Sequence, residues 1–599
     1  ALATFAGLDT RASREEIVRA LYPELAGKQL TEEPPLAPTS VEIEISGFPS
    51  YRAGVPVDWW LDPYDDPSWR MFFQSLEWTS SLEAESAIVV VSDWVSSQLL
   101  EHHGPEFQWG DHAIALRINR ARRLIERYIV TSERPSLPAL WAASKVIATH
   151  LYALATDTCY TRGHNHGVMQ DRAILRTVLR SPTIANADGL WSLAANRFGE
   201  QAIHAVTSEG VHVENSTGYH AFFMGLSLEM VELLRRRDTP VEEAILALAP
   251  RMAAVMAQLL QPNKTFPQLG DTENLEVAEY GLSLVERIRG AGLGGSGADE
   301  LEWVLTDGAL GSRPSATDAV YRESGYAIFR DDWDRGRDAI SAHFTCAKLS
   351  KIHYQRDETS FSIYGHGREL IVDPGLYGYR DDPLTRYSRG VFGHNVLVVD
   401  DHDHEARGTS RIENYSISER LSWVRGAHDH YQDLGVRRLA RTFAHGKPNV
   451  FLVVDHVDAD GSHRLDQQLL LHPDLEVLSR PAPQTVVLGP GGESTPALVV
   501  TTLPGAVIEI HRGTAADADA PPRGWWFPSF GVEVPTHQLV VHWQHDGGSS
   551  DLPLLVAVLA PATEHPDVVL TTFESSGAEV RLEWAIGGES ASAQLPTGR

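Results

Sequence analysis

Two stretches of this chain each place side chains of the kinds that transfer protons in catalysis next to an apolar run. The first, "TRGHNHGVMQDRAILR", sets Asn165 and His166 just before a segment with helical spacing. The second, "GVHVENSTGYHAFF", places Glu214 and Tyr219 ahead of another such segment. Each stretch by itself also fits a structural role, because Asn165 or Ser216 could cap the helix that follows.

A third stretch, residues 351–400, is dense in His, Asp, Arg and Tyr among strand-like segments. Ionisable groups beside apolar strands cost desolvation free energy unless they face water or one another. Such density indicates a cleft more often than a plain surface. Here a functional interpretation is favoured over a structural one.

The elements that must position these residues change character along the chain. Up to about residue 310, apolar residues recur at three- and four-residue spacing, which predicts helices. The segments concerned are "WGDHAIALRINRARRLIERYIV", "LPALWAASKVIATHLYALATD", "HAFFMGLSLEMVELLRRR" and "VEEAILALAPRMAAVMAQLL". Further on, short β-branched segments bounded by Gly, Pro and Asp predict antiparallel strands. We therefore expect a helical domain over 1–310 and a β domain over 311–599, with a further division near residue 480 left open.

Composition narrows the class of protein. The 599 residues, 43% of them hydrophobic, suffice for several cores and indicate a soluble multidomain protein. A formal charge of -29 disfavours nucleic acid and anionic membranes as partners. Only Cys159 and Cys346 occur, so no disulfide framework is expected. The absence of a visible export signal slightly favours a cytoplasmic protein over a secreted or periplasmic one with its signal removed. A homodimer is left open, and no organic cofactor is expected.

Taken together, the motifs resemble those of the heparinase II/III-like polysaccharide lyases in order and spacing. The matching segments include "VDWWLDPYDDPSWR", "WGDHAIALRINRARRLI", "HNHGVMQDRAIL", "GVHVENSTGYH", "FPQLGDTEN", "HYQRDETSFSIYGHGRELIVDPGLYGY" and "GHNVLVVD". The resemblance implies an α+β multidomain fold, with an N-terminal incomplete (α/α) toroid, a C-terminal antiparallel β-sandwich and an active site between them. It also implies cleavage of 4-linked uronic-acid glycans by β-elimination, which leaves unsaturated uronate ends.

The resemblance assigns catalytic roles to four residues. Asn165 would neutralise the sugar carboxylate, and one preorganised donor of this kind is typically worth about 3 to 4 kcal/mol. Tyr219 would protonate the leaving oxygen, and could also act as base when H5 and O4 lie on the same side of the ring. His166 is the natural base for the opposite C5 epimer. His353 would help to bind or neutralise the carboxylate.

Substrate-binding and metal-binding residues are also predicted. Arg389, with Arg386 and Arg356, could supply local positive charge, although solvated strand-edge arginines would look the same; Glu214 is placed with them as a substrate-binding residue. The family's metal ligands fall on three positions, Gln355, Asp373 and His394. Gln is a poor ligand for Zn²⁺, while a harder ion such as Ca²⁺ or Mn²⁺ tolerates its amide oxygen better. The sequence leaves two alternatives for this site: one structural divalent ion, or a hydrogen-bond network that holds no metal.

Two other classes of function remain. A glycoside hydrolase would need two opposed carboxylates, for which Glu214 and Asp271 are candidates. A non-catalytic protein that binds acidic glycans is the second alternative. Within the lyase hypothesis the partner is an acidic polysaccharide or oligosaccharide of glycosaminoglycan, alginate or glucuronan type, and the sequence leans slightly to the first.

Overall fold

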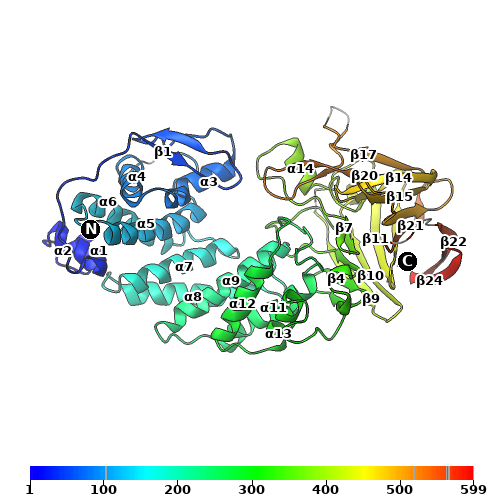
Figure 1. The fold of residues 1–599 in the computed structure, drawn as a ribbon, viewed down its shortest axis with the longest axis horizontal. Helices are drawn as coiled ribbons and strands as arrows, with labels where there is room; N and C mark the ends of the chain where they lie inside the picture. The colour runs from blue at the N-terminus through cyan, green and yellow to red at the C-terminus, as the bar shows by residue number, and fades with distance from the viewer. Residues whose placement is uncertain (102–103, 406, 517–519, 562, 564–566, 598–599) are drawn as a thin grey trace. The chain divides into compact units, whose positions relative to one another are not determined.

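The computed structural model describes residues 1–101, 104–405, 407–516, 520–561, 563 and 567–597 (Figure 1). Its chain contacts divide it into two compact units. The first comprises Ala1–Ala205 and Leu226–Leu246, and the second comprises Val206–Gly225 and Ala247–Arg599. Helix α9 (Thr217–Arg235) contributes residues to both units. No helix in the described part of the chain is long and apolar enough to cross a membrane.

The first unit is helical, apart from one β-hairpin (Figure 1). Helix α5 packs against α3, α4, α6 and α7, and α7 packs against α8. The hairpin consists of β1 (Ser40–Ile43) and β2 (Tyr51–Gly54). The helices are α1 (Leu2–Phe5), α2 (Arg14–Leu21), η1 (Pro23–Leu25), α3 (Pro67–Ser75), η2 (Glu77–Ser80), α4 (Ala84–Gln98), α5 (Asp111–Thr131), α6 (Leu137–Leu154), α7 (Asn165–Arg180), α8 (Ala187–Ala205) and α10 (Glu243–Leu246).

Helix α7 begins differently from the sequence-based expectation. The N-cap is His164, whose side chain accepts a hydrogen bond from the backbone N–H of His166. Asn165 is the first helical residue, so its interpretation as an N-cap is wrong. Because the preceding imidazole already satisfies a backbone donor at this terminus, the Asn165 amide is not needed for capping.

The second unit combines helices with antiparallel sheets. Its helices are α11 (Leu248–Leu259), α12 (Ala278–Gly290), α13 (Ser296–Leu305), η3 (Trp333–Asp338), α14 (Pro383–Arg389) and η4 (Gln432–Leu434). Helix α13 ends at Leu305 and the first strand of the sheets, β3, begins at Ala319. The segment predicted as one helix over 241–260 is broken between α10 and α11. The predicted domain boundaries near 310 and 480 stay a prediction.

The described strands form two large antiparallel sheets and smaller ones beside them. The eight-stranded sheet runs β14 (Leu475–Ala482), β15 (Thr485–Pro490), β16 (Leu498–Thr502), β21 (Gly548–Val558), β12 (Val450–Ala459), β11 (Val436–Gly446), β10 (Leu421–His428), β9 (Ser410–Ser416). The five-stranded sheet runs β3 (Ala319–Tyr321), β4 (Tyr326–Arg330), β5 (Ser341–Thr345), β6 (Phe361–Gly365), β7 (Arg368–Ile371). The others contain β17 (Ile508–Arg512), β20 (His537–His545), β13 (His463–Leu470) and β8 (Leu397–Val399); β22 (Val568–Ser576), β23 (Glu579–Ile586) and β24 (Glu589–Pro596); and β18 (Trp525–Trp526) with β19 (Val534–Pro535).

An aromatic core joins the two large sheets. The ring of Phe443 on β11 stacks against four others, with centroid distances of 4.8 to 6.1 Å. Three of these, Phe329, Phe344 and Phe361, belong to the five-stranded sheet. Side chains from two sheet faces that meet in one core define a β-sandwich. The helical first part and the antiparallel sandwich confirm the predicted fold class.

Candidate active site

Tyr219 lies at the start of α9, where the helix is capped by a buried serine. The Ser216 hydroxyl accepts a hydrogen bond from the Tyr219 backbone N–H at 3.2 Å, and itself donates to the carbonyl of Asp271 at 3.0 Å. The phenol ring stacks on the imidazole of His353, with ring centroids 3.5 Å apart and planes 15° apart. The structure therefore brings Tyr219 and His353 together, as a shared reaction centre would require.

A buried carboxylate orients His353. Glu214 Oε2 lies 3.0 Å from Nδ1 of His353 and 3.6 Å from Nε2 of His212. Glu214 is 1% exposed. A carboxylate this deeply buried needs polar partners, and the two imidazoles supply them. The arrangement supports a positioning role for Glu214, and its predicted contact with substrate stays a prediction.

The residue after Glu214 is hydrogen-bonded to the loop that carries His353. Asn215 has a φ of 55°, and its side chain bonds the backbone of residues 349–352, an arrangement called the Asn215 clamp below. Its Oδ1 accepts from the Leu349 N–H at 2.9 Å, and its Nδ2 donates to the carbonyls of Ser350 and Ile352 at 3.0 Å each. The clamp fixes the imidazole over the phenol ring.

Close packing at Gly270 leads to a first prediction. A Cβ on Gly270, where φ is 59°, would lie 2.1 Å from the carbonyl oxygen of Asn215 and 2.9 Å from that of His353. We expect Gly270→Ala to displace both backbones, to lower the free energy of unfolding by about 1 to 3 kcal/mol and to reduce turnover strongly. Thermal unfolding and initial rates measure both effects.

The matched control is Gly492→Ala. Gly492 has a φ of 80°, but no atom lies within 4 Å of the position that a Cβ would take there, so this change tests backbone strain alone. It should cost stability and leave turnover per folded molecule unchanged. Equal turnover of the Gly270→Ala enzyme and wild type would contradict the packing argument.

A second phenol completes the cluster around Tyr219. Tyr379 Oη donates to Asp271 Oδ2 at 2.8 Å, and Gln355 Nε2 donates to Asp271 Oδ1 at 3.0 Å. Burial raises the pKa of Tyr219, and the Asp271 carboxylate adds to this effect, while a hydrogen bond with Tyr379 opposes it. Tyr219 is therefore a neutral phenol at physiological pH, which suits a proton donor. Sequence reasoning did not single out Tyr379, although the quoted segment "DPGLYGY" contains it.

The three arginines differ in their surroundings. The Arg389 guanidinium lies 5.8 Å from the centroid of the Tyr379 ring, close to the phenol cluster. Arg356 forms an ion pair with Asp403, and Arg386 forms one with Asp381 on the surface. Of the three, Arg389 has the contact that best fits a role beside Tyr219. All three substrate-binding assignments stay predictions.

The first unit holds a separate imidazole cluster at the N-termini of α5 and α7. His166 Nδ1 lies 3.0 Å from Asp111 Oδ2, and the ring of His166 lies 4.2 Å from that of His112 and 4.0 Å from that of His164. Burial, with the neighbouring His166, lowers the pKa of His112 to about 3, so that ring is neutral. Asn165 is 2% exposed. Asn165 and His166 thus lie in the first unit and Tyr219 and His353 in the second, and their meeting in one site stays a prediction.

The three predicted metal positions include one direct contact. His394 Nδ1 lies 3.0 Å from Asp373 Oδ2. Gln355 Oε1, Asp373 Oδ1 and His394 Nε2 are buried atoms without a hydrogen-bond partner in the described structure. Two oxygens and one imidazole nitrogen left unpaired are a donor set that fits a divalent ion. Within the described residues, no group of three or more His, Cys, Asp and Glu side chains has a metal-binding arrangement.

The described structure thus combines helices with an antiparallel sandwich and stacks a phenol on an imidazole that faces a buried carboxylate. Comparison with known families agrees with the resemblance found in the motifs. Residues 43–284 match the heparinase II/III N-terminus profile, and residues 313–569 match the profile described as heparinase II/III-like, C-terminal. The chain belongs to the heparinase II/III-like family.

Curated relatives include two heparin-sulfate lyases. That of Pedobacter heparinus is 18% identical over 451 residues, which cover 72% of this chain and 66% of the relative. That of Bacteroides thetaiotaomicron is 21% identical over 344 residues, which cover 53% of this chain and 48% of the relative. The chain thus matches about half to two thirds of the length of these relatives.

Solved structures show the same fold. A structure of heparinase III has a TM-score of 0.76 at 15% identity, over 92% of this chain and 86% of its own. Heparan sulfate lyase HepC from Pedobacter heparinus has a TM-score of 0.65 at 15% identity, over 99% of this chain and 92% of its own. These likenesses support the predicted combination of a toroid and a β-sandwich.

Proposed function

We propose that this chain is a polysaccharide lyase that cleaves 4-linked uronic-acid glycans by β-elimination. The observation that carries the proposal is the stack of Tyr219 on His353, with Glu214 holding the imidazole. Family membership and the heparin-sulfate lyases among its relatives support a glycosaminoglycan as the substrate class.

The C5 hydrogen of a uronate is barely acidic while the neighbouring carboxylate keeps its negative charge. Hydrogen-bond donors aimed at that carboxylate stabilise the enolate-like dianion that forms when the proton leaves. Asn165 is the proposed neutral donor. His353, whose Nδ1 faces Glu214, is the proposed second donor.

Tyr219 is the proposed acid for the leaving O4. Burial and nearby carboxylates raise the pKa of its phenol, so the proton needed by the departing oxygen is in place. When H5 and O4 lie on the same side of the ring, the phenol oxygen can also take the C5 proton if it has first lost its own. His166 is the proposed base for the opposite C5 epimer.

A divalent ion is proposed at Gln355, Asp373 and His394. The three unpaired buried atoms of these residues would hold it, and the Asp373 contact at Nδ1 leaves Nε2 of His394 for the ion. The ion would have a structural role: its positive charge would hold these three side chains together and so stabilise the sheet region that carries them. Mn²⁺ or Ca²⁺ suits the amide oxygen better than Zn²⁺.

Product chemistry tests the proposal against a hydrolase. Only elimination makes a conjugated, ultraviolet-absorbing unsaturated uronate, so absorbance should rise as polymer is cut. Heparan-, chondroitin- and hyaluronan-type polymers, alginate and glucuronan form the substrate panel, with product sizing to separate endo from exo cleavage. Reducing ends that appear without absorbance would favour a hydrolase. The geometry disfavours one, because Glu214 faces two imidazoles and Asp271 is held by Tyr379 and Gln355.

Glu214→Gln tests the positioning of His353. The amide keeps the size of the side chain but loses the charge that faces the imidazole, so we expect kcat to fall by about tenfold to a hundredfold. The pH profile of kcat should also change, which a purely structural defect would not cause. Glu369→Gln is the control, since Glu369 is a buried carboxylate that accepts hydrogen bonds from Asn263, Thr265 and Asn274. An unchanged pH profile in the Glu214 variant would refute the positioning role.

A further inference from the structure

The carboxylate of Asp111 faces the imidazole that is proposed as the base for one class of uronate. Asp111 is the first residue of α5, and its Oδ2 lies 3.0 Å from Nδ1 of His166, the second residue of α7. The Thr161 hydroxyl donates to the same carboxylate oxygen. The side chains of Asp111 and His166 are 33% and 25% exposed. The two groups are therefore in contact with each other and still accessible from solvent.

The ionisation of Asp111 determines which nitrogen of His166 carries a proton. Burial raises the pKa of Asp111, but hydrogen bonds with His166 and Thr161 outweigh burial, so this pKa lies well below its usual value. Asp111 is thus ionised at neutral pH and can only accept hydrogen bonds. Nδ1 of His166 is then the donor, and in the neutral ring the lone pair lies on Nε2.

Two further imidazoles limit how the His166 ring can turn. The ring centroids of His112 and His164 lie 4.2 and 4.0 Å from that of His166, each ring tilted by 45°. Burial, with the neighbouring His166, lowers the pKa of His112 to about 3, so this ring is neutral and does not repel a protonated His166. The His164 side chain also accepts a hydrogen bond from the His166 backbone N–H at 3.1 Å. Ring packing and helix capping thus keep His166 against Asp111.

We propose that Asp111 is a positioning residue that makes His166 the base for uronates whose H5 and O4 lie on opposite sides of the ring. This inference rests on the proposed lyase function and deepens it. Nε2 takes the C5 proton, the C5–H electron pair becomes the C4=C5 bond, and O4 leaves with the C4–O4 pair and gains a proton from the acid. The Asp111 carboxylate stabilises the imidazolium that forms. Substrates with H5 and O4 on the same side, for which Tyr219 is the proposed acid and base, do not need Asp111.

Asp111→Asn tests the proposal on pairs of polymers that differ in configuration at C5. The pairs are chondroitin and dermatan, heparosan and its C5-epimerised form, and polymannuronate and polyguluronate; the second of each pair has H5 and O4 on opposite sides. The amide keeps the size of the carboxylate but can donate to Nδ1, which moves the ring proton to Nε2 and blocks the base. We expect kcat, measured by ultraviolet absorbance, to fall about a hundredfold to ten-thousandfold on the second polymer and less than about threefold on the first.

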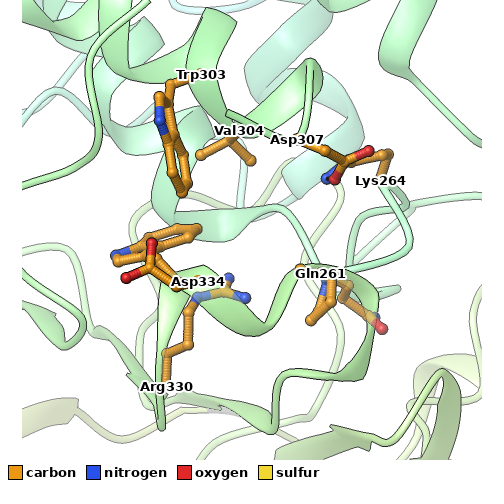
Figure 2. Close-up of a pocket in the computed structure, with 10 residues that line it drawn as sticks. Gln261, Lys264, Trp303, Val304, Asp307, Arg330 and Asp334 are labelled. Atoms are coloured by element: carbon orange, nitrogen blue, oxygen red, sulfur yellow. Dashed lines mark hydrogen bonds and ion pairs between the residues drawn. The ribbon is translucent and has the colours of Figure 1, made fainter. Parts of the chain in front are cut away.

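Two carboxylate variants are the controls. Asp188→Asn removes a carboxylate from the first turn of α8, where it pairs with Arg237 at 2.6 Å, and so tests the loss of a charge at a helix start. Asp307→Asn removes one in the second unit, where Asp307 pairs with Lys264 at 2.5 Å beside a small cavity, as Figure 2 shows. Both variants should keep the wild-type rate on both polymers of a pair.

Nitrogen NMR of full-length protein labelled at the histidine ring nitrogens reads the tautomer of His166 independently of activity. Comparison with the His166→Gln protein assigns the signals of this ring. At a pH where the ring is neutral, we expect the proton on Nδ1 in wild type and on Nε2 in Asp111→Asn. A proton on Nε2 in wild type overturns the proposal, whatever the enzyme cleaves.

The kinetic outcomes separate this inference from the proposed function. The Asp111 inference fails and the lyase proposal stands if wild type forms unsaturated product from only the first polymer of each pair. The same holds if Asp111→Asn slows both polymers equally, as a merely structural role would, or slows neither. If no polymer gives unsaturated product with wild type, the proposed function itself fails, and this inference fails with it.

Discussion

Tyr219→Phe is expected to lower kcat by about a hundredfold to ten-thousandfold, while substrate binding changes little. The change removes one hydroxyl and keeps the ring that stacks on His353 at 3.5 Å, so the site should keep its shape. In the proposed mechanism, the lost oxygen atom carries the proton for the leaving oxygen. Initial rates from ultraviolet absorbance give kcat, and oligosaccharide binding to the inactive protein gives Kd.

Tyr280→Phe is the matched control. The Tyr280 hydroxyl donates to the carbonyl of Ala221 on the same helix α9 at 3.3 Å, so its removal tests the structural loss of one phenol hydroxyl. This variant should keep its turnover. A Tyr219→Phe enzyme with near wild-type kcat would refute the assignment of Tyr219 as the acid. If the wild-type protein binds glycans but does not cleave them, a non-catalytic binding protein is favoured.

The order of elements could be predicted from the sequence because periodicity is a local property. Spacing alone placed α5, α6 and α9 and the change to strands near residue 310, and in the structure α13 ends at Leu305 and β3 begins at Ala319. The break between α10 and α11 was missed, since the apolar pattern runs through it. Helix α9 contributes residues to both compact units. This division depends on contacts between distant parts of the chain, so the periodicity of the sequence could not predict it.

The candidate site was only partly predictable, because its supports are distant in sequence. Motifs pointed to Tyr219 and His353, but the Asn215 clamp joins residues 135 positions apart. Nothing local marks Tyr379 as a neighbour of Asp271, 108 positions away. Such contacts depend on how the sheet loops pack against the start of α9, and a single sequence carries no direct signal of that packing.

Substitution of Asn165 should have the second large effect. We expect Asn165→Ala to lower kcat by about a hundredfold to a thousandfold, because the enolate-like dianion loses a preorganised neutral donor. Asn165→Asp should be worse, since a carboxylate there would repel the sugar carboxylate. Both kcat and KM are measured on the same uronate polymer, and the loss should fall mainly on kcat.

The fold should survive the change to alanine. His164 and not Asn165 caps α7, so the helix keeps its N-terminal hydrogen bond. Asn119→Ala is the control: it removes an amide on α5 that donates to the Ala115 carbonyl at 2.9 Å, and it should leave kcat unchanged. If Asn165→Ala loses less than about tenfold in kcat, the carboxylate is neutralised elsewhere, and His353 with Arg389 would become the groups to vary next.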